Sequence, residues 1–309
     1  MNLRQIELLR ALIRCETTVG AASELGLSQP AVSNALRALE KQAGFPLFDR
    51  VNNRLFPTEE AQMIYAESET IFRLHATLAS RVRDLKEHRT GLLRIMATPP
   101  LGYSVVPHAL NRFLSQNPKI KIFFDIRSYE NVLTAVEDGQ AELGFVMGLR
   151  QTPPFLESEL LFEGAMVCVM KKNHPLSRQS IVRPHHFRSE RFIALEHGTR
   201  MGTLLRSAFS EAGEPFNYAV EVRYANSACV LAEYGVGLAV VDPLSAKYGH
   251  YPSLVTVKFE PKTLVTASFV KSRKRPLSHA AEAFLRDMRL SSQEAANAIN
   301  KGKREKNEV

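Results

Sequence analysis

The stretch "GLSQPAVSNALRALEKQAGFPLFDR", Gly26 to Arg50, decides how the first part of the chain folds. Gly26 suits the left-handed position that ends a helix, and Ser28 suits the N-cap of the next helix. Three apolar residues at helical spacing then predict one buried face: Val32, Leu36 and Leu39. The turn and the helix behind it therefore predict the second half of a helix-turn-helix motif.

The opposite side of the same helix is polar, and it carries Gln29, Ser33, Asn34, Arg37 and Lys41. A solvated helix usually carries Glu and Lys pairs on such a face. Gln or Asn side chains instead suit adenine edges, and Arg suits guanine edges, in a DNA major groove. The alanines between them keep the helix slim enough for a groove about 12 Å wide. Taken alone, this face fits a solvated bundle and a DNA contact equally well.

The segments on both sides of this helix favour DNA. Before it, "LRQIELLRALIR" places four apolar residues on one helical face: Leu3, Ile6, Leu9 and Ile13. "TTVGAASELG" predicts a short helix capped by Thr17 or Thr18. After it, "RVNNRLFPT" predicts a hairpin, because Asn52-Asn53 can adopt positive φ. Residues 1–58 therefore predict a helix-rich DNA-binding domain, a helix-turn-helix followed by a hairpin.

Residues 59–90 predict a long helix followed by a linker. Thr58 suits its N-cap, and Glu59 and Glu60 suit the positive end of the helix dipole. An apolar row runs along the helix at Ile64, Ile71, Leu74, Leu78, Val82 and Leu85. Such a row on a polar helix has to be covered, most simply by a second copy of the helix. The helix therefore predicts dimerisation, and "KEHRTG", Lys86 to Gly91, reads as the linker.

Residues 91–290 alternate between strands and helices and predict an α/β fold. "LLRIMAT", "KIKIFFDI" and "ELGFVMG" are apolar strands separated by helical segments, in the βαβαβ order of a parallel sheet. A second set runs from "AMVCVMKK" to "TLVTASFV", and residues 150–162 and 262–270 read as extended connections. We expect two Rossmann-like lobes, lobe I at about 91–161 and 268–290 and lobe II at about 162–267. Residues 291–309 lack a clear apolar face and predict a disordered basic tail.

Composition limits the class of protein but does not prove a partner. The net charge of +8 and pI of 9.4 permit a polyanionic partner. Much of that charge lies in residues 271–309, so the case for DNA rests on pattern. No apolar run reaches the roughly 18 residues of a membrane span, and no signal peptide is evident. Three widely spaced cysteines without a CxxC motif fit the reducing cytoplasm.

A two-lobed α/β clamp holds small ligands between its lobes, where strands end and helices begin. The candidates at these positions are Thr98, Pro100, Ser128, Arg150, Thr199, Arg200, Asn226 and Asp242. Helix N-termini favour a carboxylate, and Arg150 or Arg200 adds a counter-charge. Asp242 suits an ammonium group, so we expect an amino acid or another carboxylate. Ser128 and Thr199 fit ordinary helix caps equally well.

No motif for catalysis, a cofactor or a metal is evident, so we expect no enzyme and no cofactor. The sequence lacks GxSxG, P-loop, GxGxxG and HExxH motifs. His185-His186 suggests a metal site, but adjacent histidines in a loop are expected to point apart. No carboxylate or Cys lies at ligand spacing from them. Cys229 is interpreted as a small buried hydrophobe, with a redox sensor as the alternative.

The stretch "AASELGLSQPAVSNALRALEKQAGFPLFDR…LFPTEEA" resembles the DNA-binding domain of LysR-type transcriptional regulators, and the resemblance extends over residues 1–290. It implies a winged helix-turn-helix, a linker helix and a periplasmic-binding-protein-like effector domain with a coinducer cleft. It implies DNA contacts from Ser28, Gln29, Pro30, Ser33, Asn34 and Arg37, and from Arg50, Asn52 and Arg54 in the wing. Many members carry a basic residue where this chain has Asn34, which predicts an adenine contact there instead. A homodimer or homotetramer and contact with RNA polymerase are further implications.

Together these features predict a sequence-specific DNA-binding transcriptional regulator that a small-molecule effector controls. The alternative is a cytosolic solute-binding α/β protein with a structural helical appendage. The two differ in one measurable respect, because a solute-binding protein would show no preference for a DNA sequence.

Overall fold

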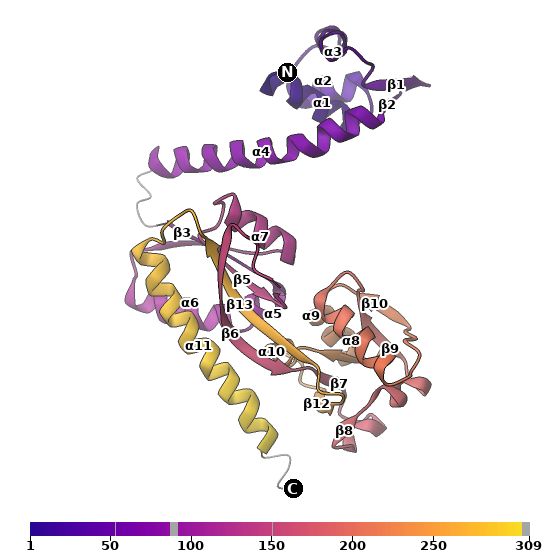
Figure 1. Cartoon of the computed structure of the whole chain (residues 1–309), viewed down its shortest axis with the longest axis vertical. Helices are drawn as coiled ribbons and strands as arrows, with labels where there is room; N and C mark the ends of the chain where they lie inside the picture. The colour runs from indigo at the N-terminus through magenta and orange to yellow at the C-terminus, as the bar shows by residue number, and fades with distance from the viewer. Residues whose placement is uncertain (53, 87–91, 150, 305–309) are drawn as a thin grey trace. The chain divides into compact units, whose positions relative to one another are not determined.

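The computed structural model describes residues 1–52, 54–86, 92–149 and 151–304, and the chain divides into two compact units (Figure 1). The units are Met1–Arg83 and Asp84–Val309. The first unit contains α1 (Leu3–Cys15), α2 (Thr18–Leu25), α3 (Gln29–Ala43), β1 (Phe48–Val51) and β2 (Arg54–Pro57). It also contains most of α4 (Glu59–Lys86), and β1 and β2 pair antiparallel as a wing.

The predicted caps of the first unit are confirmed. Thr17, Ser28 and Thr58 each accept a hydrogen bond from the backbone N–H three residues further on, at 3.1, 3.4 and 3.3 Å. Gly26 ends α2 with φ of 65°, and Asn52 turns the hairpin with φ of 51°. Both values lie in the left-handed region that Gly and Asn adopt most readily. Local sequence therefore fixes where these helices and the wing begin and end.

The core of the first unit is formed by side chains from its three short helices and the wing. The fully buried members include Leu9, Leu12, Ala21, Val32, Leu36, Leu39 and Leu47. The predicted stripe of α3 is thus confirmed. On α1 the buried face differs slightly from the prediction, since Leu12 is fully buried while Leu3 and Ile13 are only half-buried.

The second unit contains two sheets, which form two lobes. The five-stranded sheet of lobe I has the order β4-β3-β5-β13-β6, built from β3 (Leu92–Ala97), β4 (Lys121–Ile126), β5 (Leu143–Met147), β6 (Leu156–Ala165) and β13 (Leu264–Ser272). Strands β4, β3 and β5 are parallel, as the βαβαβ pattern predicted, while β13 is antiparallel to β5 and β6. Its helices are α5 (Pro99–Gly102), α6 (Val105–Gln116), α7 (Tyr129–Glu137) and α11 (His279–Arg304).

The six-stranded sheet of lobe II has the order β10-β9-β11-β7-β12-β8. Its strands are β7 (Val167–Lys171), β8 (Ile181–Val182), β9 (Phe192–Leu195), β10 (Val220–Val222), β11 (Leu238–Val241) and β12 (Leu254–Phe259). Its helices are α8 (Arg200–Glu211), α9 (Ala225–Glu233) and α10 (Pro243–Tyr248), with 3-10 turns η1 (Pro175–Arg178) and η2 (Pro184–Ser189). Strands β8 and β12 and helix α10 had not been predicted from the sequence.

The two segments expected as extended connections are long strands of lobe I. β6 covers most of residues 150–162 and pairs with β13 over nine positions, with one register shift. The chain passes from lobe I to lobe II between Ala165 and Val167 and returns between Phe259 and Leu264. These strands read as connections because their polar residues alternate with apolar ones, as expected where one face is solvated.

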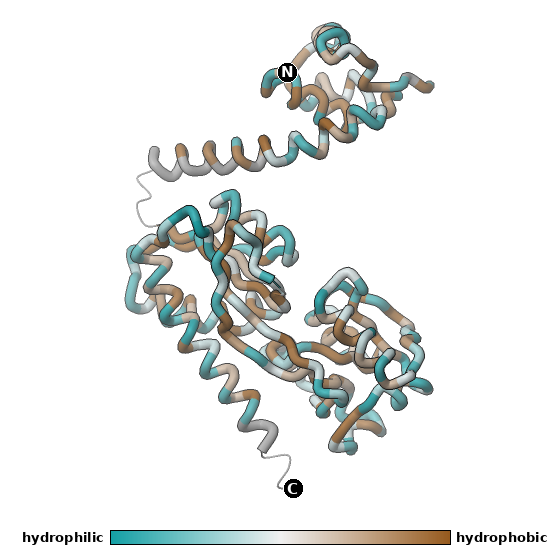
Figure 2. The backbone as a smooth tube through the Cα atoms, in the orientation of Figure 1, coloured by the Kyte–Doolittle hydropathy of each residue, from teal (hydrophilic) through white to brown (hydrophobic). Residues whose placement is uncertain are grey.

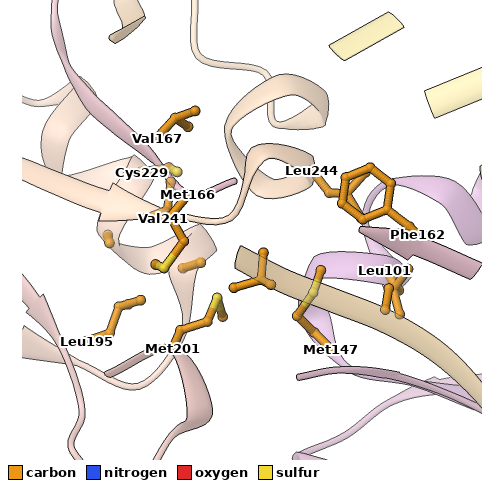
Figure 3. Packing of buried hydrophobic residues seen from close by; sticks show 14 of the residues in the cluster. Leu101, Met147, Phe162, Met166, Val167, Leu195, Met201, Cys229, Val241 and Leu244 are labelled. Atoms are coloured by element: carbon orange, nitrogen blue, oxygen red, sulfur yellow. The ribbon is translucent and has the colours of Figure 1, made fainter. Parts of the chain in front are cut away.

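One apolar cluster extends through both lobes. Figure 3 shows part of it, in which Leu101, Met147 and Phe162 come from lobe I and Met201 and Leu244 from lobe II. All five side chains are at most 9% exposed. The base between the lobes is therefore a packed core.

The expectation of a disordered tail over residues 291–309 is wrong for residues 291–304. α11 continues to Arg304, and Ser291, Ser292 and Ala295 are at most 3% exposed. Figure 2 shows apolar residues recurring along this helix, which packs against α6. Beyond Leu290 its buried residues are Ser and Ala, small residues that allow close packing but give little hydrophobic signal. Residues 305–309 lie outside the described part of the chain.

Candidate functional site

The outer face of α3 is the candidate nucleic-acid interface. Pro30, Asn34 and Arg37 are exposed, as are Gln29 and Lys41. The inner stripe of the same helix is fully buried, so this polar face cannot turn inward without exposing the core of the domain. Ser28 is exposed at the start of α3, where its hydroxyl also serves as the N-cap. Amide and guanidinium groups on one exposed helical face are the groups that read base edges.

Ser33 differs from the prediction, because it is only 9% exposed. Its hydroxyl accepts a hydrogen bond of 3.0 Å from the Gln29 amide, which also donates to the Thr18 hydroxyl at 3.2 Å. The position lies at the contact between α2 and α3, at the edge of the predicted face. Ser33 therefore orients Gln29 within the free domain, and the exposed polar face is narrower than expected.

The wing is formed by the predicted hairpin. Arg54 is exposed and forms an ion pair of 3.4 Å with Glu16, which follows α1. Such exposed pairs stabilise by at most about 1 kcal/mol, so Glu16 holds the guanidinium only weakly. The Leu55 backbone N–H donates to the Glu16 carbonyl at 2.8 Å and ties the wing to α1. The side chain of Arg50 and all of Asn53 lie outside the described residues.

Most of the predicted dimerisation row on α4 is exposed. Ile71, Leu74, Leu78 and Val82 have exposed fractions between 46% and 61%. Ile64 does not belong to this free row, because it packs against the core of the DNA-binding domain. The side chain of Leu85 lies outside the described residues. Met63, which the sequence reasoning missed, is 66% exposed.

A cleft of about 290 Å³ lies between the lobes of the second unit. Five of the eight predicted ligand residues line it: Thr98, Pro100, Ser128, Thr199 and Arg200. Met147 and Met201 give it an apolar wall, and Gly148 brings the lobes close. A Cβ on Gly148 would lie 2.7 Å from the Cγ of Arg200, and its φ of 79° also favours glycine.

Three helix N-termini border the cleft, those of α7, α8 and α9. The first N–H groups of a helix have no partner within it, so these ends favour a carboxylate or another anion. α5 also begins at the cleft, but its first residues, Pro99 and Pro100, have no N–H and supply apolar surface instead. Ser128 and Thr199 do act as helix caps, with acceptor distances of 3.5 and 3.0 Å. The Thr98 hydroxyl accepts from the Met147 backbone N–H at 3.1 Å.

Two charged residues of the cleft were missed by the sequence reasoning. Arg223, after β10, forms ion pairs with Glu130 of α7 at 3.5 Å and with Glu196 at 3.1 Å. Glu130 and Arg223 both line the cleft, and their contact joins lobe I to lobe II. An acidic residue two positions after the Ser128 cap was a possible signal, but it also fits a simple interaction with the helix dipole.

Asp242 and Asn226 do not line the cleft, contrary to the prediction. Asp242 is fully buried as the N-cap of α10, where its carboxylate accepts from the Ser245 backbone N–H at 2.8 Å. Burial raises the pKa of this carboxyl above its ordinary value. Its position at the end of a strand and before a proline marks an N-cap equally well. Arg150 lies outside the described residues.

The remaining reactive side chains show no sign of chemistry. Cys168 and Cys229 are fully buried, and burial raises the pKa of both thiols, which opposes a thiolate sensor at Cys229. The rings of His185 and His186 lie side by side at 4.1 Å instead of pointing apart. His186 already accepts a hydrogen bond from the Arg183 backbone N–H at 2.9 Å. Within the described ranges, no cluster of His, Cys, Asp and Glu could hold a metal ion.

Of the helices that the structure describes, none is both long enough and apolar enough to cross a membrane.

Both units match models of known protein families. Residues 3–62 match the bacterial regulatory helix-turn-helix protein, lysR family, and residues 86–290 match the LysR substrate binding domain. The Transcriptional activator protein LysR of Escherichia coli K12 is 31% identical over 287 residues, which cover 92% of this chain and 91% of that protein. The Octopine catabolism/uptake operon regulatory protein OccR of Rhizobium meliloti is 30% identical, covering 80% of this chain and 81% of that protein.

Solved structures share the fold. Full-length CbnR, in a crystal structure with its target DNA, matches with a TM-score of 0.70 and 18% identity, over 94% of this chain and 100% of that one. The matched helix-turn-helix domain contains the exposed face of α3, and the matched substrate binding domain contains the cleft between the lobes. The chain belongs to the LysR family of transcriptional regulators: it is a DNA-binding regulator with an effector-binding domain, and the family is not enzymatic.

Proposed function

We propose that two copies of the chain pair through α4 and place the exposed faces of two α3 helices on one DNA duplex. The observation that carries this proposal is the uncovered row of Ile71, Leu74, Leu78 and Val82. The DNA-binding domain has only a small net positive charge, since residues 1–58 contain seven Lys and Arg against five acidic residues. Because phosphate contacts supply much of the affinity, one copy alone would bind weakly. Pairing doubles these contacts and fixes the distance between half-sites.

In this arrangement Gln29, Asn34 and Arg37 meet base edges in the major groove, and Ser28 and Pro30 lie at the start of the helix beside them. Ser33 acts by orienting Gln29. Arg50, Asn52 and Arg54 meet the backbone or the minor groove from the wing. Asn34 suits adenine, so we expect an A·T pair at the position it reads. We propose that dimers associate further into tetramers, that the protein works in the cytoplasm and that its output passes through RNA polymerase; the relative named as a transcriptional activator supports this last point.

The DNA proposal is tested by selecting duplexes from a random-sequence library with the full chain and measuring affinity by fluorescence anisotropy at several salt concentrations. We expect a selected site with two half-sites that survives competition by unrelated DNA. Replacing Asn34 with Ala should relax the preference at one position of each half-site, at a cost of about 1–3 kcal/mol for the best base. Equal affinity for all sequences would instead support a solute-binding protein with a structural appendage.

We propose that the effector is a small dipolar molecule, such as an amino acid, that binds in the cleft. The N-termini of α8 and α9, together with Arg200 and Arg223, make the lobe II side favourable for a carboxylate. Glu130 on the lobe I side offers the carboxylate that an ammonium group requires, the role first predicted for Asp242. The volume of about 290 Å³ suits a ligand of amino-acid size.

The contact between Arg223 and Glu130 suggests how binding reaches the DNA-binding domain. A dipolar ligand would compete for both side chains, since its carboxylate attracts Arg223 and its ammonium group attracts Glu130. The lobes would then be joined through the ligand, and the population of lobe arrangements would shift by as much as the ligand prefers one of them.

The effector proposal is tested by thermal denaturation of the full chain with α-amino acids, the matching α-hydroxy acids and the matching amines. We expect an amino acid to raise the melting temperature, with stabilisation of about 2.7 kcal/mol at 100 times its Kd. Glu130→Gln should weaken the amino acid at least tenfold and leave the hydroxy acid unchanged. Glu137→Gln, at the other end of α7 and outside the cleft, is the matched control. Equal binding of amino and hydroxy acids would contradict the role of Glu130.

A further inference from the structure

The side chain of Arg10 connects the DNA-binding domain to α4. From α1, its guanidinium forms an ion pair of 2.5 Å with Glu69 and lies over the rings of Phe72 and Tyr65, at 4.2 and 5.4 Å from their centroids. Only 14% of the Arg10 side chain is exposed. Its three partners are spaced four and three residues apart on α4, so they occupy one face of that helix.

This contact extends the region over which α4 is held, from Tyr65, next to Ile64, to Phe72. Ala61 is fully buried in the core of the domain and Ile64 packs against it, whereas Phe72 lies about two turns further along the helix. Ser68, between Ile64 and Phe72, is 2% exposed. The exposed apolar row begins at Ile71, between Glu69 and Phe72. α4 is therefore held from Ala61 to Phe72, over about three turns. A helix held over this length has a fixed direction, whereas one held only at its end can pivot.

We propose that Arg10 is a positioning residue that sets the spacing and orientation of the two DNA half-sites. This inference rests on the proposed pairing through α4. If two α4 helices pair, the direction of each helix relative to its own domain decides where each α3 meets the duplex. A small rotation of the domain about the end of α4 would move α3 by several ångströms along the groove, because α3 lies far from the axis of rotation.

The chemistry of the contact requires arginine in particular. A planar guanidinium can lie on an aromatic ring and pair with a carboxylate at the same time, whereas an ammonium group is a compact and strongly hydrated charge. Glu69 is partly buried, so loss of Arg10 leaves a carboxylate facing two aromatic rings. The contact therefore favours one arrangement of α1 and α4 over neighbouring ones. A single arrangement is what a fixed distance between half-sites requires.

The test uses the duplex that the wild-type full chain selects from a random-sequence library, together with versions that have 2 bp added or removed between the half-sites. Two base pairs rotate one half-site by about 70°. We expect wild type to lose at least about tenfold in affinity on the altered duplexes, and Arg10→Met to lose no more than about threefold. Arg10→Lys keeps the charge without the planar stack and should fall between them.

Arg4→Met is the matched control, since it removes one positive charge from an exposed position of the same helix. Loss of a charge lowers affinity for all duplexes alike and leaves the spacing ratio unchanged. If Arg10→Met proves unfolded by circular dichroism, Glu69→Gln removes the ion pair with less disturbance and should also flatten the spacing preference. A folded Arg10→Met with the wild-type spacing ratio overturns this inference alone. A wild-type chain that is monomeric and indifferent to spacing overturns the pairing through α4 as well.

Discussion

Two long amphipathic helices, α4 and α11, differ in whether their apolar faces are buried. α4 has 28 residues and α11 has 26. On α11 the inner residues Phe284, Leu285 and Met288 are at most 3% exposed, because α6 and the lobe I sheet cover them. On α4, Leu74 and Leu78 are 49% and 61% exposed. The same type of sequence pattern thus serves a domain core in one helix and leaves a surface open in the other.

The difference shows which part of the molecule is complete as a single chain. Lobe I buries the apolar face of α11 within itself. The apolar row of α4 is exposed at Ile71, Leu74, Leu78 and Val82. Burying a Leu or Ile side chain stabilises by about 1.5–3 kcal/mol, so covering four such residues in each of two copies is a substantial driving force. A second α4 has the matching row and length.

Leu78→Asp gives the largest effect that this comparison predicts. Two aspartates would face each other in the paired helices, and the dimer should dissociate at micromolar concentration. Operator affinity would then fall by about 10²–10⁴-fold, because the two domains no longer bind as one unit. Analytical ultracentrifugation and anisotropy on the selected duplex measure the two effects. Leu290→Asp, at an exposed leucine of α11, is the control and should change neither. Tight operator binding by a monomeric Leu78→Asp chain would refute pairing through α4.

Phe284→Ala should act on folding instead of association. Phe284 is fully buried and meets Phe113 and Phe145 at ring distances of 5.6 and 5.9 Å. Removal of such a ring typically costs about 3–5 kcal/mol in the free energy of unfolding. Urea denaturation followed by circular dichroism measures this loss. Ile71→Ala on α4 is the counterpart, and at protein concentrations below dimerisation it should cost less than about 1 kcal/mol. Equal losses would show that α4 is already covered within one chain.

Prediction from the sequence succeeded where a local rule allows only one structure. Thr17, Ser28 and Gly26 end helices by chemistry that is complete within a few residues, and Val32 and Leu36 are buried as their spacing predicted. The parallel core of lobe I followed from the βαβαβ pattern for the same reason. These features need no information about distant parts of the chain.

The errors concern positions where one residue type suits two roles. Asp242 at a strand end fitted an ammonium site and an N-cap, and only the fold shows that it faces the core. Glu130 fitted a helix dipole, and only the fold brings Arg223 to it from 93 positions further along the chain. Ser33 lies at the margin between an exposed face and the contact with α2, a margin that periodicity cannot resolve.

The end of α11 offers a sharper version of the same comparison. Its inner residues beyond Leu290 are small, yet Ser291, Ser292 and Ala295 are almost fully buried. A chain that stops after Leu290 should lose about 1–3 kcal/mol in the free energy of unfolding, since these contacts and the last turns of the helix disappear together. A chain that stops after Arg304 should match wild type. Differential scanning calorimetry of both truncations decides the point, and two identical melting curves would restore the prediction of a disordered tail.

The smallest effect concerns Asp242, which lobe II buries completely and whose carboxylate accepts a hydrogen bond from the Ser245 backbone N–H. Burial raises the pKa of this carboxyl, so the folded chain holds the proton more tightly than the unfolded chain. The free energy of unfolding should therefore decrease as the pH rises from the ordinary Asp value to the raised value in the folded chain.

Asp242→Asn keeps an N-cap acceptor for the Ser245 N–H and removes the titration. Relative to wild type, its free energy of unfolding should increase across that pH window. Asp242→Ala separates the two roles, since it removes the cap as well and should be less stable than Asp242→Asn at every pH. A difference between wild type and Asp242→Asn that does not change with pH would show that the buried carboxyl titrates as it does in the unfolded chain.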